Sequence, residues 1–325
     1  LDISTGGCGA ADYVEGVREE YGDRRRVLEG RRVGSLYVGG ANPSSLPGGE
    51  LIRLVDGVGA SVTEPEAEQS LEVDPQQVTP RRIDCWYEAG VNRLVVECRS
   101  FDDGKLERLG IDSTGRRVRR GLDRLFEDGR FSVGVELTFG APGESEADWE
   151  EELEVLASYP AIDSLFGDEY IGRGEEGSAA MLEALCRRAG EFGLRRYEPA
   201  SFARPGRESR QNTLYFTGGE YLGLGVGASS LALPGGRGVV RRSNEPEVDA
   251  YLEAVPDGGA DRRIGPEDYL VERLTLAMYT RFGLDLEEVE RQFADCRPRG
   301  RLGEMLDTAR AVFNDWIGRE LIEAE

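Results

Sequence analysis

The chain has 325 residues, of which 62 are acidic and 40 are basic, and its formal net charge is −22. An acidic surface repels nucleic-acid phosphates and anionic lipids, which argues against both as primary partners. Histidine is absent, so the chain offers no imidazole for acid–base catalysis, zinc binding or heme ligation. The cysteines are odd in number and form no CxxC pair: Cys8, Cys85, Cys98, Cys186 and Cys296.

No stretch of the sequence approaches the ~20 apolar residues of a membrane-spanning helix. Residues 1–7 also lack the basic segment and apolar run of a secretory signal. We therefore expect a soluble, cytoplasmic protein without a membrane span. We also expect the natural start to lie upstream of Leu1, because no initiator Met is present. The oligomeric state is left open.

Short apolar runs alternate with amphipathic stretches through the first half of the chain, which is the βα pattern of a parallel sheet. Strands are expected at 35–38, 70–73, 93–98, 132–139 and 162–166. Helices are expected at 11–29, 49–58, 80–89, 114–127, 148–158 and 177–192. The alternation fits a βα barrel or an open doubly wound sheet, and in both a ligand binds at the carboxyl ends of the strands.

The second half of the chain departs from this alternation. It becomes aromatic and Gly-rich over residues 197–234, which predicts a lateral extension of the sheet. The Pro- and Gly-rich stretch 256–266 indicates a linker, and the residues from 267 onward are expected to be mostly helical. We therefore predict a barrel-like domain with its extension over residues 1–235 and a small helical domain over 236–325.

Several motifs stand in the order typical of one protein family. The Gly-rich turn VGGANPS (38–44) lets backbone amides approach a ligand closely, and further motifs follow: EVDP (72–75), AGVNRL (89–94), FGAPG (139–143), YEPASFARPG (197–206), QNTLYF (211–216) and YLGLGVGA (221–228). Together they resemble the motifs of radical S-adenosylmethionine (SAM) proteins in the group of oxygen-independent coproporphyrinogen III oxidases and heme chaperones.

This resemblance covers nearly the whole chain. It implies an α/β fold: a partial (β/α)6 radical SAM barrel with a lateral extension and a small, mostly helical C-terminal domain. It implies SAM and a [4Fe-4S] cluster as cofactors, and heme or another tetrapyrrole as a partner. The positions that would contact SAM or heme are Gly39, Gly40, Ala41, Asn42, Glu72, Arg99, Glu136, Asn212 and Tyr215.

The cluster motif of the family, C-x3-C-x2-C, corresponds to Ser4, Cys8 and Ala11. Iron–sulfur clusters need thiolate ligands, and of these three side chains only that of Cys8 can supply one. A stable [4Fe-4S] cluster is therefore not expected. We assign no catalytic residue.

The SAM and heme positions also differ from the family pattern. At the SAM site the replacements are Ala41 for Gly, Asn42 for Thr, Arg99 for Gln and Glu136 for Asp. Glu97 stands where a Gly is usual, and it adds charge and bulk where a ligand would pass. Gln211 replaces the His of the heme-chaperone motif. SAM binding is therefore in question as well.

Three interpretations remain open. The first is a catalytically impaired relative of the radical SAM heme chaperones. The second is an active radical SAM oxidoreductase that recruits a replacement ligand such as Cys98, whose strand end is expected to face the mouth of the barrel. The third is a heme-trafficking module that binds heme through Tyr215.

Other clusters of charged and aromatic residues have simpler interpretations. Glu150, Glu151 and Glu152 are expected to form the solvated face of a helix, and Asp102 and Asp103 to cap one. The tryptophans Trp149 and Trp316 are expected to pack against helices. Arginine clusters at 24–26, 116–120 and 241–242 could bind the propionates of a tetrapyrrole, but we expect them to pair with surface acids.

Overall fold

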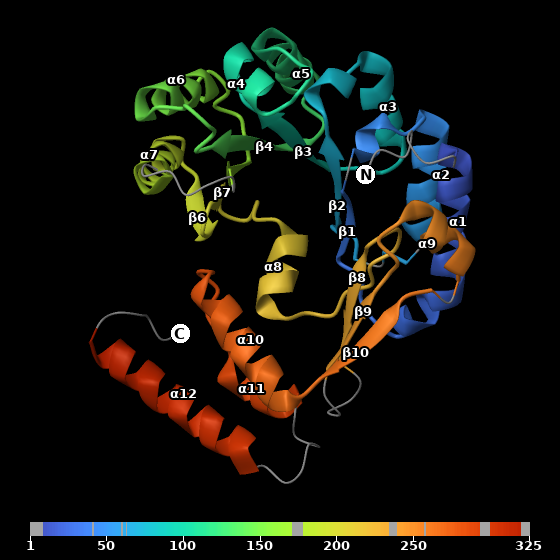
Figure 1. The fold of residues 1–325 in the computed structure, drawn as a ribbon, viewed down its shortest axis with the longest axis vertical. Helices are drawn as coiled ribbons and strands as arrows, with labels where there is room; N and C mark the ends of the chain where they lie inside the picture. The colour runs from blue at the N-terminus through green and yellow to red at the C-terminus, as the bar shows by residue number, and fades with distance from the viewer. Residues whose placement is uncertain are drawn as a thin grey trace. The chain divides into compact units, whose positions relative to one another are not determined.

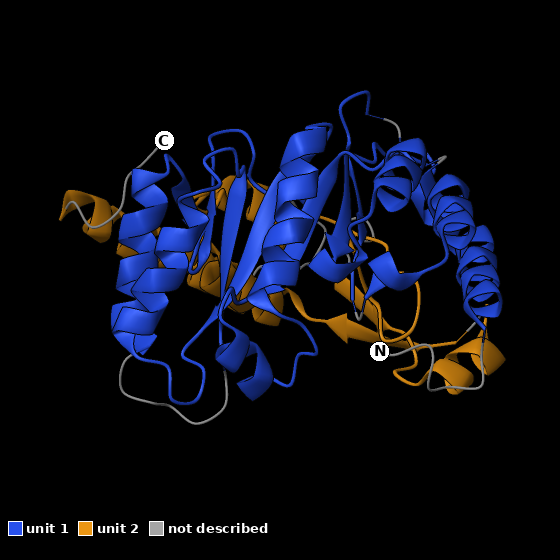
Figure 2. Cartoon of the chain, turned by 90° about the horizontal axis from the view of Figure 1, so that it is seen from above, with its two compact units in different colours: residues 1–211 blue, residues 212–325 orange. Residues whose placement is uncertain are grey.

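A computed structural model describes residues 9–40, 42–59, 61–62, 64–170, 178–233, 239–256, 258–292 and 300–319. The chain falls into two compact units, Leu1–Gln211 and Asn212–Glu325 (Figure 2). The domain division at residues 235 and 236 stays a prediction.

A seven-stranded sheet with strand order β1-β2-β3-β4-β5-β7-β6 forms the centre of the first unit (Figure 1). Neighbouring strands from β1 to β5 pair in parallel, whereas β7 pairs antiparallel with both β5 and β6. Two antiparallel pairings restore the strand direction, so β6 runs the same way as β1 to β5. The partial barrel is therefore confirmed, with β7 inserted between its last two parallel strands. The strands are β1 (Ser35–Val38), β2 (Glu68–Val73), β3 (Arg93–Arg99), β4 (Ser132–Phe139), β5 (Ser164–Glu169), β6 (Arg195–Glu198) and β7 (Ser201–Ala203).

Helices α1 to α7 cover the convex side of the curled sheet (Figure 1), and at least one of them follows each strand from β1 to β5. Side-chain caps begin several of them: Asp102 accepts the backbone N–H of Lys105 at 2.7 Å, as its sequence position predicts. Within the described residues, none of the helices is both long and apolar enough to cross a membrane. The helices are α1 (Ala10–Arg24), α2 (Gly48–Gly59), α3 (Pro80–Glu88), α4 (Asp103–Arg108), α5 (Gly115–Asp128), α6 (Glu146–Leu156), α7 (Ser178–Glu191) and α8 (Arg210–Thr217), with 3-10 turns η1 (Arg25–Leu28), η2 (Pro43–Ser45) and η3 (Pro75–Gln77).

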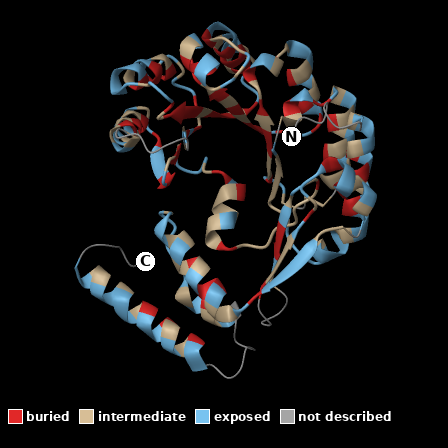
Figure 3. Ribbon diagram, viewed as in Figure 1, coloured by how far each residue is buried: buried red, intermediate tan, exposed pale blue. Residues whose placement is uncertain are grey.

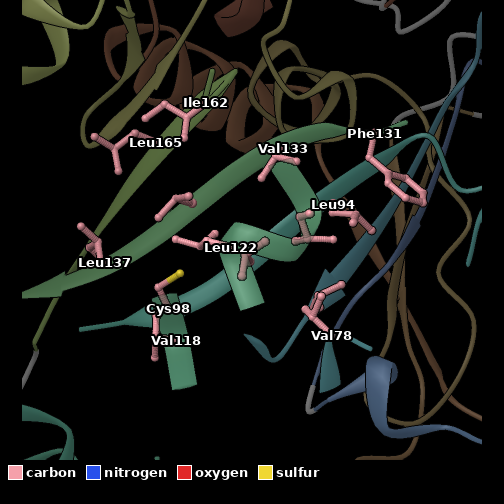
Figure 4. Close-up of a cluster of buried hydrophobic side chains, with 14 of the residues drawn as sticks. Val78, Leu94, Cys98, Val118, Leu122, Phe131, Val133, Leu137, Ile162 and Leu165 are labelled. Atoms are coloured by element: carbon pink, nitrogen blue, oxygen red, sulfur yellow. The ribbon is translucent and has the colours of Figure 1, made fainter. Parts of the chain in front are cut away.

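The main hydrophobic core lies between the sheet and its helices. β3 and β4 are largely buried (Figure 3). Every second residue of β3, such as Leu94 and Cys98, belongs to one apolar cluster. Val118 and Leu122 of α5 belong to the same cluster (Figure 4). Side chains alternate between the two faces of a strand. The intervening residues of each strand therefore lie on the concave face.

The second unit combines three antiparallel strands, in the order β10-β9-β8, with helices that share its core. The predicted linker at 256–266 is wrong, because it contains β10, which pairs with β9 through backbone hydrogen bonds. Four of the five residues of β10 are exposed, and an edge strand of this kind lacks the apolar alternation of a buried strand. The remaining elements are β8 (Ser229–Ala232), β9 (Val239–Ser243), β10 (Ala260–Ile264), α9 (Val248–Ala254), α10 (Pro266–Met278), α11 (Leu286–Gln292) and α12 (Gly300–Gly318).

Two glycines in helices of the first unit provide a matched test of how closely α5 packs against the turn after β2. A Cβ added at Gly121 of α5 would lie 2.5 Å from the Pro75 carbonyl oxygen, whereas one added at Gly22 of α1 would meet no atom within 4 Å. Gly121→Ala should therefore lower the free energy of unfolding by roughly 1–3 kcal/mol through overpacking. Gly22→Ala should raise it by about 0.5–1 kcal/mol, because Gly is costly inside a helix. Urea denaturation measures both; changes of the same sign would contradict this packing.

Candidate functional site

Polar side chains gather on the concave face, at the carboxyl ends of the parallel strands. Of the residues predicted to contact SAM, the structure brings Glu72, Arg99 and Glu136 to this edge. They alternate with core residues of the same strands, which places them opposite the helices. The polar residues of this edge are Tyr37 on β1, Glu72 on β2, Glu97 and Arg99 on β3, Glu136 on β4 and Asp168 on β5.

The guanidinium of Arg99 connects three strands. Its Nη2 lies 2.6 Å from Glu97 Oε1, and its Nη1 lies 2.8 Å from Asp168 Oδ2 and also pairs with Glu136. The Arg99 side chain is 29% exposed and that of Glu136 is 13% exposed. Partly buried ion pairs are screened less by salt than surface pairs. This cluster therefore holds the ends of β3, β4 and β5 together electrostatically.

The backbone at Arg99 is strained. Its φ of 60° lies in the left-handed region, and the pairing of β3 with β4 shifts register between Glu97 and Arg99. A left-handed residue other than Gly costs roughly 1–2 kcal/mol. Such strain persists where surrounding contacts over-determine the conformation, and it concentrates at functional sites. At Arg99 the three ion pairs are the contacts that hold it.

Glu72 occupies the space above the Gly-rich turn that follows β1. Its carboxylate accepts hydrogen bonds from the Tyr37 hydroxyl and the Gly40 backbone N–H, both at 2.7 Å. A Cβ at Gly39 would lie 2.7 Å from the Glu72 carboxyl group, and Gly40 has a φ of +113°, so both positions require glycine. The Gly40 amide is consequently already engaged by a side chain of the protein.

Asn42 stabilises the same turn through side-chain hydrogen bonds. Its Oδ1 accepts the Ser44 hydroxyl at 2.7 Å, and the Ser44 oxygen in turn accepts the backbone N–H of Asp74 at 3.0 Å. This chain of hydrogen bonds fastens the turn after β1 to the end of β2. The neighbouring predicted position, Ala41, lies outside the described residues.

Four carboxylates share this edge with one guanidinium, and their pKa values reflect the imbalance. Burial raises the pKa of Glu136 to about 7, although Arg99 lowers it and Glu97 raises it further. Burial also raises the pKa of Glu97 against the lowering effect of Arg99. Burial and the Glu72 carboxylate raise the pKa of the Tyr37 phenol. The site therefore suits positive charge, and it can retain a proton on Glu136 near neutral pH.

The donor set for an iron–sulfur cluster does not fit. Ser4 and Cys8 lie outside the described residues, and Ala11, on α1, presents only a methyl group. The three positions offer at most one thiolate, whereas a [4Fe-4S] cluster of this family needs three. In the described part of the chain, no three His, Cys, Asp or Glu side chains are grouped so that they could hold a metal ion.

Cys98 cannot serve as a replacement ligand, and the expectation that its strand end faces the mouth of the barrel is wrong for its side chain. It is 1% exposed and lies in the apolar cluster between the sheet and α5 (Figure 4). Strand alternation directs it to the helix side, between the concave-facing Glu97 and Arg99. Burial also raises the pKa of its thiol, which disfavours the thiolate that iron requires.

The predicted heme positions lie on and near α8. Gln211, which replaces the family His, is 7% exposed, and its Oε1 accepts the Ser35 hydroxyl at 2.9 Å at the amino end of β1. That is the opposite end of the strand from the Gly-rich turn. Asn212 and Tyr215 belong to the second unit. The Tyr215 ring is 43% exposed and lies edge-on to Tyr221, with 4.6 Å between the ring centroids.

A buried charge network lies behind the strand ends and corrects the expectation of a solvated glutamate run. Glu152 is 5% exposed, because it lies on the inner face of α6, and its Oε2 pairs with Lys105 Nζ at 2.5 Å. Lys105 also contacts Glu144 Oε1 at 2.6 Å, and Glu152 Oε1 accepts the backbone N–H of Phe101 at 2.7 Å. The network thus ties the loop after β4 to the loop after β3. Glu150 and Glu151 are exposed or nearly so, as expected.

Three members of the concave edge were not among the predicted contact residues: Tyr37, Asp168 and Glu97, the last of which was expected only to obstruct a ligand. Asp168 was missed because the strand was expected to end at residue 166, two positions short of it. Tyr37 was treated only as part of the Gly-rich turn. The two-residue alternation that selects Glu97 and Arg99 also selects Tyr37 and Asp168 once the strand bounds are known.

The raised pKa of Glu136 predicts a pH-dependent stability. Between its ordinary value of 4.5 and about 7, the folded protein holds a proton that the unfolded chain has lost. The free energy of unfolding should therefore fall as pH rises through this window, with a slope of at most about 1.4 kcal/mol per pH unit. Glu136→Gln should remove this component, and Glu107→Gln, an exposed control, should keep it. Urea denaturation at several pH values tests this; parallel curves for wild type and Glu136→Gln would refute it.

Comparison with known proteins finds similarity to heme chaperones and, in fold, to a radical SAM enzyme. No family model matches it. It is 26% identical over 328 residues to the heme chaperone HemW of Lactococcus lactis, covering 93% of this chain and 83% of that protein. It is 29% identical over 247 residues to the heme chaperone HemW of Escherichia coli, covering 70% of this chain and 64% of that protein.

A solved structure shares the fold. Coproporphyrinogen III oxidase (HemN) from Escherichia coli, described as a radical SAM enzyme, superposes with a TM-score of 0.73 at 20% identity, covering 88% of this chain and 72% of that one. The resemblance inferred from the sequence motifs is confirmed by both the sequence relatives and the shared fold. The chain is a relative of the HemW heme chaperones, and it has the fold of the radical SAM protein HemN.

Proposed function

We propose that this chain is a tetrapyrrole-handling protein on a radical SAM scaffold that does not carry out the radical SAM reaction. The observation that carries the proposal is the Arg99 cluster at the carboxyl ends of β3, β4 and β5. In this fold the strand ends form the ligand edge, and here one of the chain's own cations already occupies that edge and pairs with three of its four carboxylates.

The charge of Arg99 competes with SAM. SAM carries a positive sulfonium and a positive amino group, so an edge of carboxylates would attract it. Glu97, Glu136 and Asp168 instead have a cation as partner within hydrogen-bonding or ion-pair distance. Displacing Arg99 would leave its charge, and the partly buried carboxylates of Glu97 and Glu136, without these ion pairs. The Gly40 amide is likewise occupied by Glu72.

The tetrapyrrole part of the proposal has separate support. The two bacterial relatives are named heme chaperones. The chain has no His, so heme iron would need a different ligand; a tyrosine phenol is one that heme proteins use, and Tyr215 is 43% exposed.

Anaerobic reconstitution with iron and sulfide tests the absence of the cluster. The wild-type chain should hold iron only at background, because Ser4 and Ala11 supply no thiolate. The variant Ser4→Cys/Ala11→Cys restores the three-thiol spacing and should take up more iron, which makes it the matched positive control. Iron analysis and the visible spectrum provide the readout. A stoichiometric cluster in the wild type, with cleavage of added SAM, would contradict the proposal.

Heme titration followed by the Soret band tests the tetrapyrrole part. We expect the wild-type chain to shift the band, and Tyr215→Phe to weaken binding by about tenfold, equivalent to about 1.4 kcal/mol. Tyr279→Phe is the control, since Tyr279 is another exposed tyrosine of the second unit. Identical titrations of wild type and Tyr215→Phe would remove Tyr215 from the proposal. A wild-type chain that leaves the Soret band unchanged would overturn tetrapyrrole binding altogether.

A further inference from the structure

A hollow on the outer surface of the first unit is lined by three arginines of one helix. Arg116, Arg119 and Arg120 of α5, with Asp123, line this open depression, whose volume is about 480 Å³. The positions 116, 119, 120 and 123 share one face of the helix, because residues three and four apart are neighbours. This surface lies on the helix side of the sheet, away from the concave edge that carries Arg99.

The arginines of this hollow do not pair with acids, contrary to the expectation from the sequence. Across the described ranges, Arg116 and Arg120 have no side-chain hydrogen bond or ion pair, and Arg119 has no ion pair. In each of the other two clusters at least one arginine pairs as expected: Arg24 with Glu20, and Arg241 with Glu272.

The charge of the hollow is therefore unbalanced. Asp123 is the acid that lines it, and its carboxylate already accepts the Tyr159 hydroxyl at 3.0 Å. Three guanidiniums against one carboxylate leave a local excess of two positive charges. Arg116 and Arg120 lie four residues apart on the helix, where like charges repel.

One of the three guanidiniums, that of Arg119, is held in place before any ligand binds. Arg119 Nη1 donates to the Phe101 carbonyl oxygen at 3.3 Å, and its guanidinium lies over the Phe101 ring, 5.4 Å from the centroid. That ring stacks on Tyr159 at a centroid separation of 6.4 Å. Arg116 and Arg120 are exposed. The hollow thus offers one fixed donor between two that can close on a ligand.

Backbone N–H groups at the start of α5 do not supply the anion-binding donors of this site. The first N–H of α5, at Gly115, donates to Asp103 Oδ1 at 2.7 Å, and that of Arg117 donates to Thr114 Oγ1 at 3.3 Å. An anion in the hollow would therefore be bound by the guanidinium forks, which match phosphate and carboxylate oxygens in pairs.

We propose that Arg116, Arg119 and Arg120 form a binding site for a small polyanion that carries two or more phosphate or carboxylate groups. The size limit follows from the charge of the whole chain, −22, which repels a long polyanion such as a nucleic acid. Fields from exposed charges fade beyond about 8 Å at physiological salt, so a small anion within the hollow experiences mainly the arginines.

Isothermal titration of the full chain with sodium pyrophosphate tests the site, and sodium succinate in a second arm distinguishes phosphate from carboxylate ligands. Arg116→Gln/Arg120→Gln should weaken binding by about tenfold or more, the scale of two lost charge-assisted hydrogen bonds. The matched control is Arg53→Gln/Arg187→Gln, which removes the same charge from arginines that pair with acids. It should change affinity less than about twofold.

The outcomes separate a built site from general electrostatics. Arg116→Lys/Arg120→Lys keeps the charge and should retain part of the affinity, and far-UV circular dichroism confirms that each variant is folded. Binding of either anion that is lost only in the Arg116→Gln/Arg120→Gln variant supports the site and identifies its ligand group. Failure of both anions to bind the wild type, or equal weakening in both double variants, overturns it. Neither result bears on iron, SAM or heme.

Discussion

The two-residue alternation of side chains along the parallel strands determines how the first unit is built. One set of residues, Leu94 and Cys98 among them, must be apolar because it packs against the helices. The other set faces the concave side and is free to be polar. At the carboxyl ends this second set comprises four carboxylates, one guanidinium and the Tyr37 phenol, so the core and the candidate site are two faces of the same strands.

Two charge networks meet at these strand ends and differ in burial. Lys105 is 2% exposed and sits among Glu144, Glu152 and the backbone of the loop after β3. Arg99 is partly exposed and joins the strands themselves. Because buried ion pairs are costly to break, the Lys105 network fixes the loops, whereas the Arg99 cluster stands where solvent or a ligand can reach it. The strained backbone φ of Arg99 therefore lies in the more accessible of the two networks.

Much of the fold could be predicted from the sequence, and the reasons for the misses are physical. The strands expected at 35–38 and 132–139 coincide with β1 and β4, because both are short runs rich in apolar residues, as parallel strands covered by helices are. β10 was missed because its exposed residues carry charge, and Glu152 because a glutamate run gives no sign of which member faces inward. The gathering of Glu72, Arg99 and Glu136 was predicted through family motifs. Their ion pairing was not, since spacing along the chain does not show which carboxylate a guanidinium will meet.

Lys105 is also the sole lysine of these 325 residues, and the structure buries it. Amine-directed chemistry, such as acylation, reductive methylation or conjugation through an isopeptide bond, has no other side chain to act on in this sequence. A reagent can reach that amine only when the loops after β3 and β4 separate. Modification of this single site would therefore count opening events of the strand ends directly, with no background from surface lysines.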